Sequence, residues 1–413
     1  MARAIWLKVN GQVFDQWTNA NVTRDLKDLS GSFSFELRDY NRSVLTFDFA
    51  SSSLTEFSLK PGMDAEVYVE NTLVLKGYIE TVAPEIDAEH AAVSISGKDK
   101  AGDLVDSAAA PSGPSEFNNV KLEEVVKRIA EPYGLTVRSD IDTGDAFPRY
   151  GIDLSETGIS AIEKGARQRH ALVMSDGVGG IVLTRTGANR APAALSLPGN
   201  VKASNGQFTH KDRHSKVIVR GQSEKAATAR DDRAAPLTGG GTPKSPEDRE
   251  ASDGSATERE RRGIVASGEA TDDEIKRYRP VVHLARSKAD EKGCKDEADW
   301  RMRTKRGESE EISYRVYGYS ENGRLWRVNE TVPIEDSFQD VFRDMLISRV
   351  TFLYGEEGRE TEIAVTSPEA FDNKPVKDRR KNVKGRKKGG SKGGKKSNGK
   401  GSSGPLDGTA SAL

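Results

Sequence analysis

The chain has 413 residues and a mass of 45.0 kDa, a length that suggests two to four domains. Apolar residues make up 35% of it and charged residues 31%, with a mean hydropathy of -0.65, which is more polar than an ordinary globular protein. Either its cores are small, as in β-barrels, or part of the chain does not pack. The formal net charge of -1 argues against a uniformly basic nucleic-acid-binding protein.

The near-zero net charge is a cancellation between two parts of the chain. Residues 374–400 hold 13 of the 63 Lys and Arg residues and a single acidic residue, Asp378. The other acidic residue of the C-terminal region is Asp407, so 50 basic and 62 acidic residues precede Lys374. An acidic body with a charge near -12 is therefore followed by a basic segment with a charge near +12.

Cysteine usage and hydropathy indicate where the chain is made. Cys294 is the only cysteine, so no intrachain disulfide can form, which fits assembly in a reducing compartment. The first residues lack the long apolar segment of a signal peptide. No stretch approaches the roughly 18 apolar residues of a membrane span. We expect a soluble protein that is not exported through a signal peptide.

The first hundred residues predict antiparallel β-structure. Apolar and polar residues alternate over 5–9, 33–37, 67–75 and 93–95. Asn10-Gly11 follows the first of these stretches, and this dipeptide is the strongest short-range signal for a hairpin. Several short strands without a helical pattern indicate a small barrel or sandwich.

The period changes after residue 97. Four apolar residues between Leu122 and Ile129 fall at helical spacing, with Asn118 or Asn119 as the expected cap and Gly134 beyond the end. Residues 157–172 predict a second helix, which leads into a hairpin with the turn sequence SDGVGG. The pattern predicts a small α+β module.

The remainder alternates between ordered and low-complexity sequence. A strand at 216–221 runs into residues 221–263, whose Gly, Pro and charged composition predicts a mobile insertion. A helical pattern follows over 272–306, and β pattern returns over 312–365. The final forty residues are rich in Gly, Ser and Lys and are predicted to be disordered.

Few residues suggest catalysis or metal binding. His210 and His214 form an HxxxH pattern, but the flanking sequence reads as loop and strand, and a metal site needs a third ligand. We interpret both as surface residues. His170 is expected near the end of its helix, where a cation is favoured by the helix dipole. The sequence predicts no metal site and no cofactor.

Nucleotide-binding and hydrolase motifs are also missing from the sequence. Gly389, Gly394 and Lys395 satisfy GxxxxGK, but Lys396 stands where a P-loop needs Ser or Thr, and no strand precedes the match. We interpret it as chance within a Gly/Lys repeat. No GxSxG motif or Cys cluster with metal spacing occurs. Nothing in the residues predicts an enzyme.

The basic segment is the most extreme feature of the sequence. Clustered Lys and Arg residues bind phosphates by counterion release, and the lack of aromatic residues between them predicts contacts that ignore base sequence. Nucleic acid, an acidic protein surface, and a solubilising terminus without a partner all stay open. The candidate contact residues are Arg379, Arg380, Lys381, Lys384, Arg386, Lys387, Lys388, Lys392, Lys395 and Lys396.

Several separated stretches carry a resemblance. They include PGMDAEVYV, LKGYIE and SGKDKAGDLVDSA in the first 108 residues, and ADWRMRTKRGES, YGYSENGRLWRVNETVPIED and DMLISRVTFLYGEEGRETEIAVTSPEAF further along. In this order, over residues 2–373, they resemble the baseplate hub proteins of Mu-type contractile phage tails, part of a superfamily with VgrG-like and late control protein D-like members. The insertion and the chain after Phe371 depart from the pattern.

The resemblance implies a mainly β fold with an α+β insert. The expected parts are a first tail-tube-like antiparallel β-barrel domain over 1–97, an α+β domain over 98–200, a second tube-like β-barrel domain over 201–373, and a disordered tail over 374–413. The second barrel domain would include a helical part near 270–306 and the 221–263 insertion. Trp6, Trp17 and Trp326 are expected in barrel cores rather than at contacts.

The resemblance also implies a structural function in the tail baseplate of a virion. Such hubs form a homotrimer that joins the hexameric tail tube to the trimeric central spike and lines the channel for DNA ejection. Expected partners are the tube and spike proteins, with the tape measure and baseplate wedge proteins beyond them, after assembly in the host cytoplasm. The alternatives are a hub-associated cell-wall hydrolase and a protein that tethers nucleic acid through its basic tail.

Overall fold

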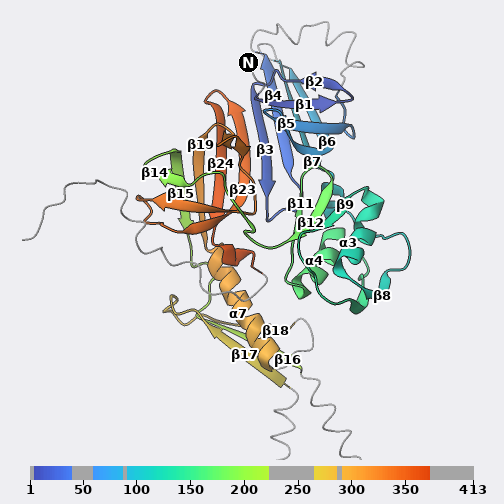
Figure 1. The fold of residues 1–413 in the computed structure, drawn as a ribbon, viewed down its shortest axis with the longest axis vertical. Helices are drawn as coiled ribbons and strands as arrows, with labels where there is room; N and C mark the ends of the chain where they lie inside the picture. Colours follow the sequence, from blue (N-terminus) through green and yellow to red (C-terminus); the bar gives the residue numbers. More distant parts are fainter. Residues whose placement is uncertain (1–3, 40–58, 87–90, 223–264, 286–290, 373–413) are drawn as a thin grey trace, which may run out of the picture.

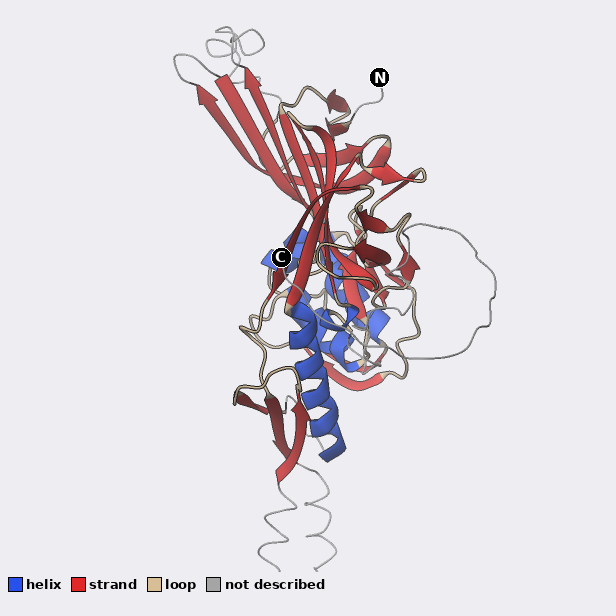
Figure 2. Ribbon diagram, turned by 90° about the vertical axis from the view of Figure 1, so that its left-hand side faces the viewer, coloured by secondary structure: helices blue, strands red, loops and turns tan. Residues whose placement is uncertain are grey.

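A computed structural model describes residues 4–39, 59–86, 91–222, 265–285 and 291–372 (Figure 1). The expected insertion, apart from Gly221 and Gln222, lies outside the described residues, and so do the basic tail and its ten candidate contact residues. The described chain is mainly β with an α+β insert, as predicted, and its strands dominate the upper part of the molecule in Figure 2.

The largest element is a 14-stranded sheet built from both ends of the chain. Its main path runs β15-β19-β24-β23-β3-β4-β7-β6-β5-β1-β2. The N-terminal strands are β1 (Ile5–Val9), β2 (Gln12–Phe14), β3 (Asn19–Asp25), β4 (Ser32–Asp39), β5 (Asp64–Val69), β6 (Thr72–Ile86) and β7 (Ala91–Asp99). The others are β13 (Asn189–Arg190), β14 (Leu195–Leu197), β15 (Val201–Phe208), β19 (Glu310–Tyr317), β22 (Glu330–Asp336), β23 (Asp344–Gly355) and β24 (Gly358–Thr366).

The two halves of this sheet meet where β3 pairs with β23, a pairing that we call the seam. Its register runs from Arg349 opposite Asp25 to Tyr354 opposite Ala20. The hydroxyl oxygens of Thr23 and Thr351 lie 3.1 Å apart across it. One apolar core extends through both halves, and Val22 and Phe352, which face each other in the register, are both buried in it. The halves therefore share a sheet and a core.

The hairpin predicted at Asn10-Gly11 is confirmed. Both residues have positive φ angles, 49° and 82°, which the tight turn between β1 and β2 requires. Trp17 and Trp326 are buried in the core, as expected. Trp6 is only partly buried and stacks on Tyr68 with ring centroids 3.9 Å apart, so this tryptophan lies on a sheet surface.

The α+β unit lies beside the sheet (Figure 1). It comprises α2 (Gly102–Asp106), β8 (Glu116–Val120), α3 (Leu122–Ala130), the short 3-10 helix Glu131–Tyr133, β9 (Thr136–Ser139), β10 (Phe147–Gly151), α4 (Gly158–Gln168), β11 (Leu172–Ser175) and β12 (Gly180–Thr184). The apolar faces of α3 and α4 are buried in one core, and the hairpin of β11 with β12 is confirmed.

The expected asparagine cap of α3 is wrong. Asn118 lies in β8 and pairs with Arg149 of β10, and the pairing of these two strands continues to Val120. Both asparagines are therefore strand residues. The N-cap of α3 is Lys121, whose side chain makes no capping hydrogen bond. Gly134 ends the segment with a φ of 66°, as predicted.

A small unit projects from the other end of the molecule (Figures 1 and 2). The small unit is the sheet β17-β16-β18 with one helix packed on it, in which β16 is Lys216–Gln222, β17 Val265–Thr271, β18 Pro280–Leu284 and α7 Glu291–Glu308. The helix predicted over 272–306 is wrong in its first part. Residues 280–284 pair in parallel with β16, a partner more than sixty residues earlier that a local helical pattern does not reveal.

The described chain is completed by three short elements. They are β20 (Ser320–Glu321), β21 (Arg324–Leu325) and a 3-10 helix, η2 (Pro368–Ala370). The β pattern predicted over 312–365 is confirmed by β19 to β24. Within the described residues, no helix has the length and hydropathy needed to cross a bilayer.

Candidate functional site

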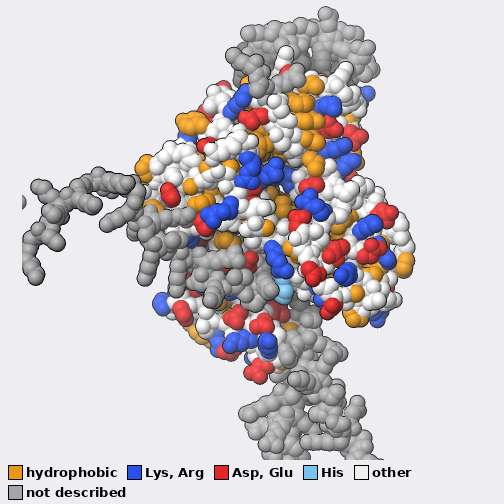
Figure 3. Space-filling model, viewed as in Figure 1, with side chains coloured by type: hydrophobic (Ala, Val, Ile, Leu, Met, Phe, Trp, Pro, Cys, Tyr) orange, Lys and Arg blue, Asp and Glu red, His pale blue; other side chains and the backbone are white. Residues whose placement is uncertain are grey.

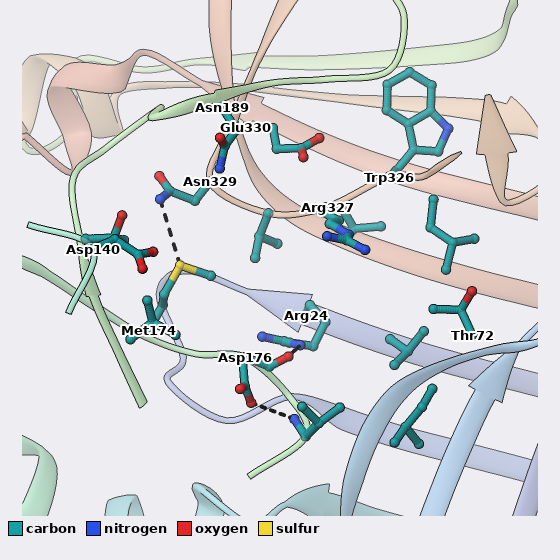
Figure 4. A pocket seen from close by; sticks show the side chains of 18 of the residues that line it. Arg24, Thr72, Asp140, Met174, Asp176, Asn189, Trp326, Arg327, Asn329 and Glu330 are labelled. Carbon is teal, nitrogen blue, oxygen red and sulfur yellow. Dashed lines mark hydrogen bonds between the residues drawn. The ribbon is translucent and has the colours of Figure 1, made fainter. Parts of the chain in front are cut away.

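A cavity with polar and apolar walls lies where the two halves of the large sheet meet the α+β unit. It has a volume of about 370 Å³. Arg24 reaches it from β3, and Met174 and Asp176 reach it from the β11–β12 hairpin (Figure 4). Trp326 comes from the segment before β22, and Glu330 is the first residue of β22. Three parts of the chain that are distant in sequence therefore meet around one space.

Arg24 connects the first half of the sheet to the α+β unit. Its guanidinium donates hydrogen bonds to the backbone carbonyls of Ser175 and Asp176, the latter at 2.9 Å. The Ser175 hydroxyl donates in turn to the buried Asp99 carboxylate at 2.8 Å. Burial lowers the pKa of Arg24 and raises the pKa of Asp99, and the attraction between the two charges opposes both shifts.

Asn329 connects the second half of the sheet to the same unit. Its φ of 62° lies in the left-handed region, which Asn tolerates better than most residues. Its side-chain oxygen accepts from the Gly187 amide at 2.8 Å, and its amide donates to the Arg185 carbonyl at 3.0 Å. Both bonds fix the chain that leaves β12, so the second half is attached through backbone groups.

Glu330 is the most unusual polar group of the cavity. One carboxylate oxygen accepts from Arg324 at 2.8 Å, while the other, Oε2, is buried and has no hydrogen-bond partner among the described residues. Only 5% of the side chain is exposed. Burial raises its pKa, although Arg324 and Arg327 favour the charged form.

The bonds of Arg24 and Asn329 are made mainly to backbone groups of neighbouring segments. Such bonds position segments of the chain. Arg24, Asn329 and Glu330 were not singled out from the sequence, although Asn329 and Glu330 lie inside the stretch RLWRVNE that contributed to the resemblance. A strand as polar as β3 gave no local signal for Arg24.

The predicted histidines lie apart from this cavity. His210 is exposed and His214 is half-buried in the turn before β16. His170 lies two residues after the end of α4, with a φ of 55°. In the part of the chain that the structure describes, no three His, Cys, Asp or Glu side chains are grouped to hold a metal ion. Arg213, between the two histidines of the HxxxH pattern, is instead buried against Asp272.

Exposed apolar side chains form a second kind of candidate site. Phe208, Tyr317 and Phe338 are 57%, 67% and 83% exposed and lie at or near β15 and β19. Val282 and Leu284 are exposed on β18 of the small unit. On the face drawn in Figure 3, acidic and basic side chains are interspersed, so charge does not single out one region there. The exposed aromatic residues near β15 are typical of an interaction surface.

Three family models match three separate parts of the chain. Residues 4–99 match the N-terminal domain of the Mu phage baseplate assembly protein GpP-like family. Residues 101–185 match the second domain of the baseplate hub protein gp44-like family, and residues 290–374 match the fourth domain of Mu phage baseplate assembly protein GpP. The matches cover the first half of the large sheet, the α+β unit, α7 and the strands β19 to β24.

Individual relatives agree with these models. The chain is 28% identical over 392 residues to the baseplate hub protein gp44 of Escherichia phage Mu, covering 93% of each chain. A 43 kDa tail protein of prophage MuSo2 from Shewanella oneidensis has 28% identity and a TM-score of 0.72, covering 89% of this chain and 99% of that one. A tail protein from Neisseria meningitidis shares the fold at 17% identity, with a TM-score of 0.66 over 89% and 98%.

The order of the domain models, the nearly full-length relative and the shared fold agree with one another and with the resemblance read from the sequence. The chain is a baseplate hub protein of a Mu-like phage tail and belongs to the Mu-type baseplate hub family.

Proposed function

We propose that three copies of this chain form a ring that joins a hexameric tail tube to a trimeric central spike and lines the channel for genome passage. The observation that carries the proposal is the seam. Through it, one chain presents two sheet halves side by side as a single unit with one core. Three such chains present six halves, which matches sixfold symmetry on one side while keeping threefold symmetry on the other.

The same proposal gives the chain a mechanical role rather than a hydrolytic one. The relative that matches along 93% of the chain is a baseplate hub protein. The polar groups around the central cavity hold segments together through backbone bonds, as a rigid adaptor needs. A net acidic body suits a channel through which DNA slides, because like charges keep the backbone phosphates from adhering.

The proposed partners follow from the position of a hub. They are the tube protein and the central spike protein, with the tape measure and wedge proteins beyond, after assembly in the host cytoplasm and within the finished virion. For residues 374–400, we propose contact with DNA or with an acidic partner surface. The sequence supports this by its 13 basic residues against one acidic residue.

The mass of the purified full-length chain, measured alone and with its neighbouring spike protein, tests the ring. We expect a species of three times 45.0 kDa, alone or in complex with the spike. A chain that stays at 45.0 kDa and assembles with neither spike nor tube would overturn the proposal. The tail is tested separately by ending the chain at Asp372. Unchanged assembly and infectivity would remove any essential role for the tail.

A further inference from the structure

The large sheet has an open end at β15. This strand is the last on the sheet path and pairs only with β19 among the described residues. Its eight residues, Val201–Phe208, correspond to a length of about 26 Å at the usual rise of a strand. Backbone N–H and C=O groups along the outer side of such a strand are available for pairing with another chain.

The sequence of β15 does little to prevent such pairing. Natural edge strands are commonly protected by proline, by charged residues or by bulges. Here the only charged residue is Lys202, which is held at one end of the strand by Glu357 and Glu360. The only irregularity lies between Val201 and Ala203, at the same end. The rest of the strand, ASNGQF, is uncharged and regular.

Two exposed aromatic residues flank the other end of β15. A Cβ atom on Gly206 would lie 2.0 Å from the side-chain oxygen of Gln339 and 2.9 Å from the Phe208 ring, so both side chains lie against this glycine. Gln339 also donates a hydrogen bond to Ser204. Phe338, the neighbour of Gln339, is 83% exposed, and Phe208 is 57% exposed. An unpaired strand edge therefore adjoins apolar surface, a combination that binds extended segments.

The opposite end of the same sheet is also open. It is formed by β2, whose three uncharged residues pair only with β1 among those described. Val13, in the middle of β2, is 40% exposed. In Figure 1 β2 and β15 lie on opposite sides of the upper part of the molecule. A molecule with two different open ends can join head to tail, and such contacts close into a ring when the rotation permits.

We propose that β15 is a subunit interface that pairs with the β1–β2 hairpin of a second copy of this chain, with Phe208 and Phe338 packed against that hairpin. The inference rests on the proposed ring and specifies its lateral contact. A second copy is the fitting occupant because the only charge on the two strands, Lys202, is already paired with Glu357 and Glu360, and because a ring needs each copy to supply one end and receive the other. The sheet would then continue from one copy to the next.

The first test is Gln207→Lys, which adds a charge near the Phe208 end of the exposed strand and leaves the buried core untouched. Its matched control is Gln168→Lys, the same substitution at an exposed position at the end of α4. Provided that the unmodified chain is trimeric, we expect Gln207→Lys to weaken trimer formation by about tenfold or more, because a charged side chain on an edge strand opposes pairing with another chain. The control should match the unmodified chain. Melting temperatures of both variants verify that each copy is folded, and Asn205→Lys should act in the same way as Gln207→Lys.

Hydrogen exchange identifies the occupant. In the trimer, amides of both 201–208 and 12–14 should exchange more slowly than in the Gln207→Lys monomer. Protection of 201–208 that appears only after the tube protein is added would assign the edge to the tube and overturn the inference. A trimer that Gln207→Lys leaves intact would also overturn the inference, and so would a trimer in which residues 12–14 gain no protection. In both cases the proposed ring would stand. A chain that never trimerises would overturn the ring and this contact together.

Discussion

The large sheet and the small unit are stabilised in different ways. The core of the large sheet contains large aliphatic and aromatic side chains from both halves, among them Phe35, Tyr314 and Phe352. The core of the small unit consists of Val217, Val219, Ala266, Ala270, Cys294 and Ala298. Small side chains bury little apolar area and therefore contribute little hydrophobic stabilisation. The small unit needs other sources of stability.

Two of those sources are visible in the structure. The guanidinium of Arg213 lies 2.7 Å from the carboxylate of Asp272, and both side chains are almost fully buried, at 3% and 2% exposure. Helix and sheet approach closely at Gly268, where a Cβ atom would lie 2.1 Å from the Lys295 backbone nitrogen. Close backbone approach and a buried ion pair therefore stabilise the small unit in place of large apolar side chains. The comparison shows that the same chain uses apolar packing where it forms one large body and specific polar pairing where a small part projects.

Phe352→Ala should have the largest effect, because it removes a buried ring from the core at the seam. The ring is 1% exposed and packs edge-on against Tyr319. We expect a loss of about 3–5 kcal/mol in the free energy of unfolding, measured by urea denaturation. Loss of amide protection in both sheet halves would show that the two share one core. Loss confined to the second half would contradict that conclusion.

Asp272→Ala should destabilise the small unit by about 3 kcal/mol, because it removes the buried partner of Arg213 and leaves that buried charge with the half-exposed Glu274. Hydrogen exchange should show lost protection in β16 and β17 and retained protection in β23. The control is Glu269→Ala, which removes a surface pair with Lys216 and should cost about 0–1 kcal/mol. Adding Arg213→Met should restore stability. A double variant as unstable as Asp272→Ala would argue against the buried charge as the cause.

Gly268→Ala tests the close approach of α7 to its sheet. The added methyl group would meet backbone atoms of Cys294 and Lys295, which cannot rotate away. We expect a loss of about 1–3 kcal/mol, typical of an overpacked contact, again confined to the small unit. The same substitution at Gly151, where a Cβ meets nothing within 4 Å, serves as the control. Equal effects at both positions would exclude crowding as the explanation.

Glu330→Gln should have the smallest effect and one that depends on pH. Burial raises the pKa of Glu330 above its ordinary value of 4.5, so the folded state favours the protonated form. That contribution to stability is fully present below pH 4.5 and is lost as pH rises through the raised pKa. The stability of the glutamine variant relative to the unmodified chain should therefore increase from pH 4 to pH 7. A constant difference over this range would contradict the raised pKa.

Local sequence chemistry predicted the turns and the amphipathic elements. Asn10-Gly11 supplies the positive φ angles of a tight hairpin, and the spacing from Leu122 to Ile129 buries one face of α3. The family resemblance supplied the mainly β fold with an α+β insert. The predictions of the hairpin and of α3 succeeded because each signal depends on residues within one turn or one element.

The strands at the seam and at the open end of the sheet gave no such signal. β3 has the sequence NANVTRD and buries only Ala20 and Val22, yet it forms the seam. β15 is mostly exposed and equally polar. β18 lies within a stretch whose local pattern predicts a helix, because its parallel pairing with β16 depends on a distant partner. Edges and junctions of a sheet require backbone pairing more than apolar alternation, so their sequences carry little trace of their role.

The seam also affects how quickly a ring could form. Because one polypeptide carries both sheet halves, they meet at an effective concentration on the order of millimolar, whatever the concentration of the protein. The β3–β23 pairing can therefore be complete within each copy before any copy meets another. A ring of six halves then needs only three molecules to associate. Assembly therefore costs the translational entropy of three molecules, whereas six separate halves would lose that of six.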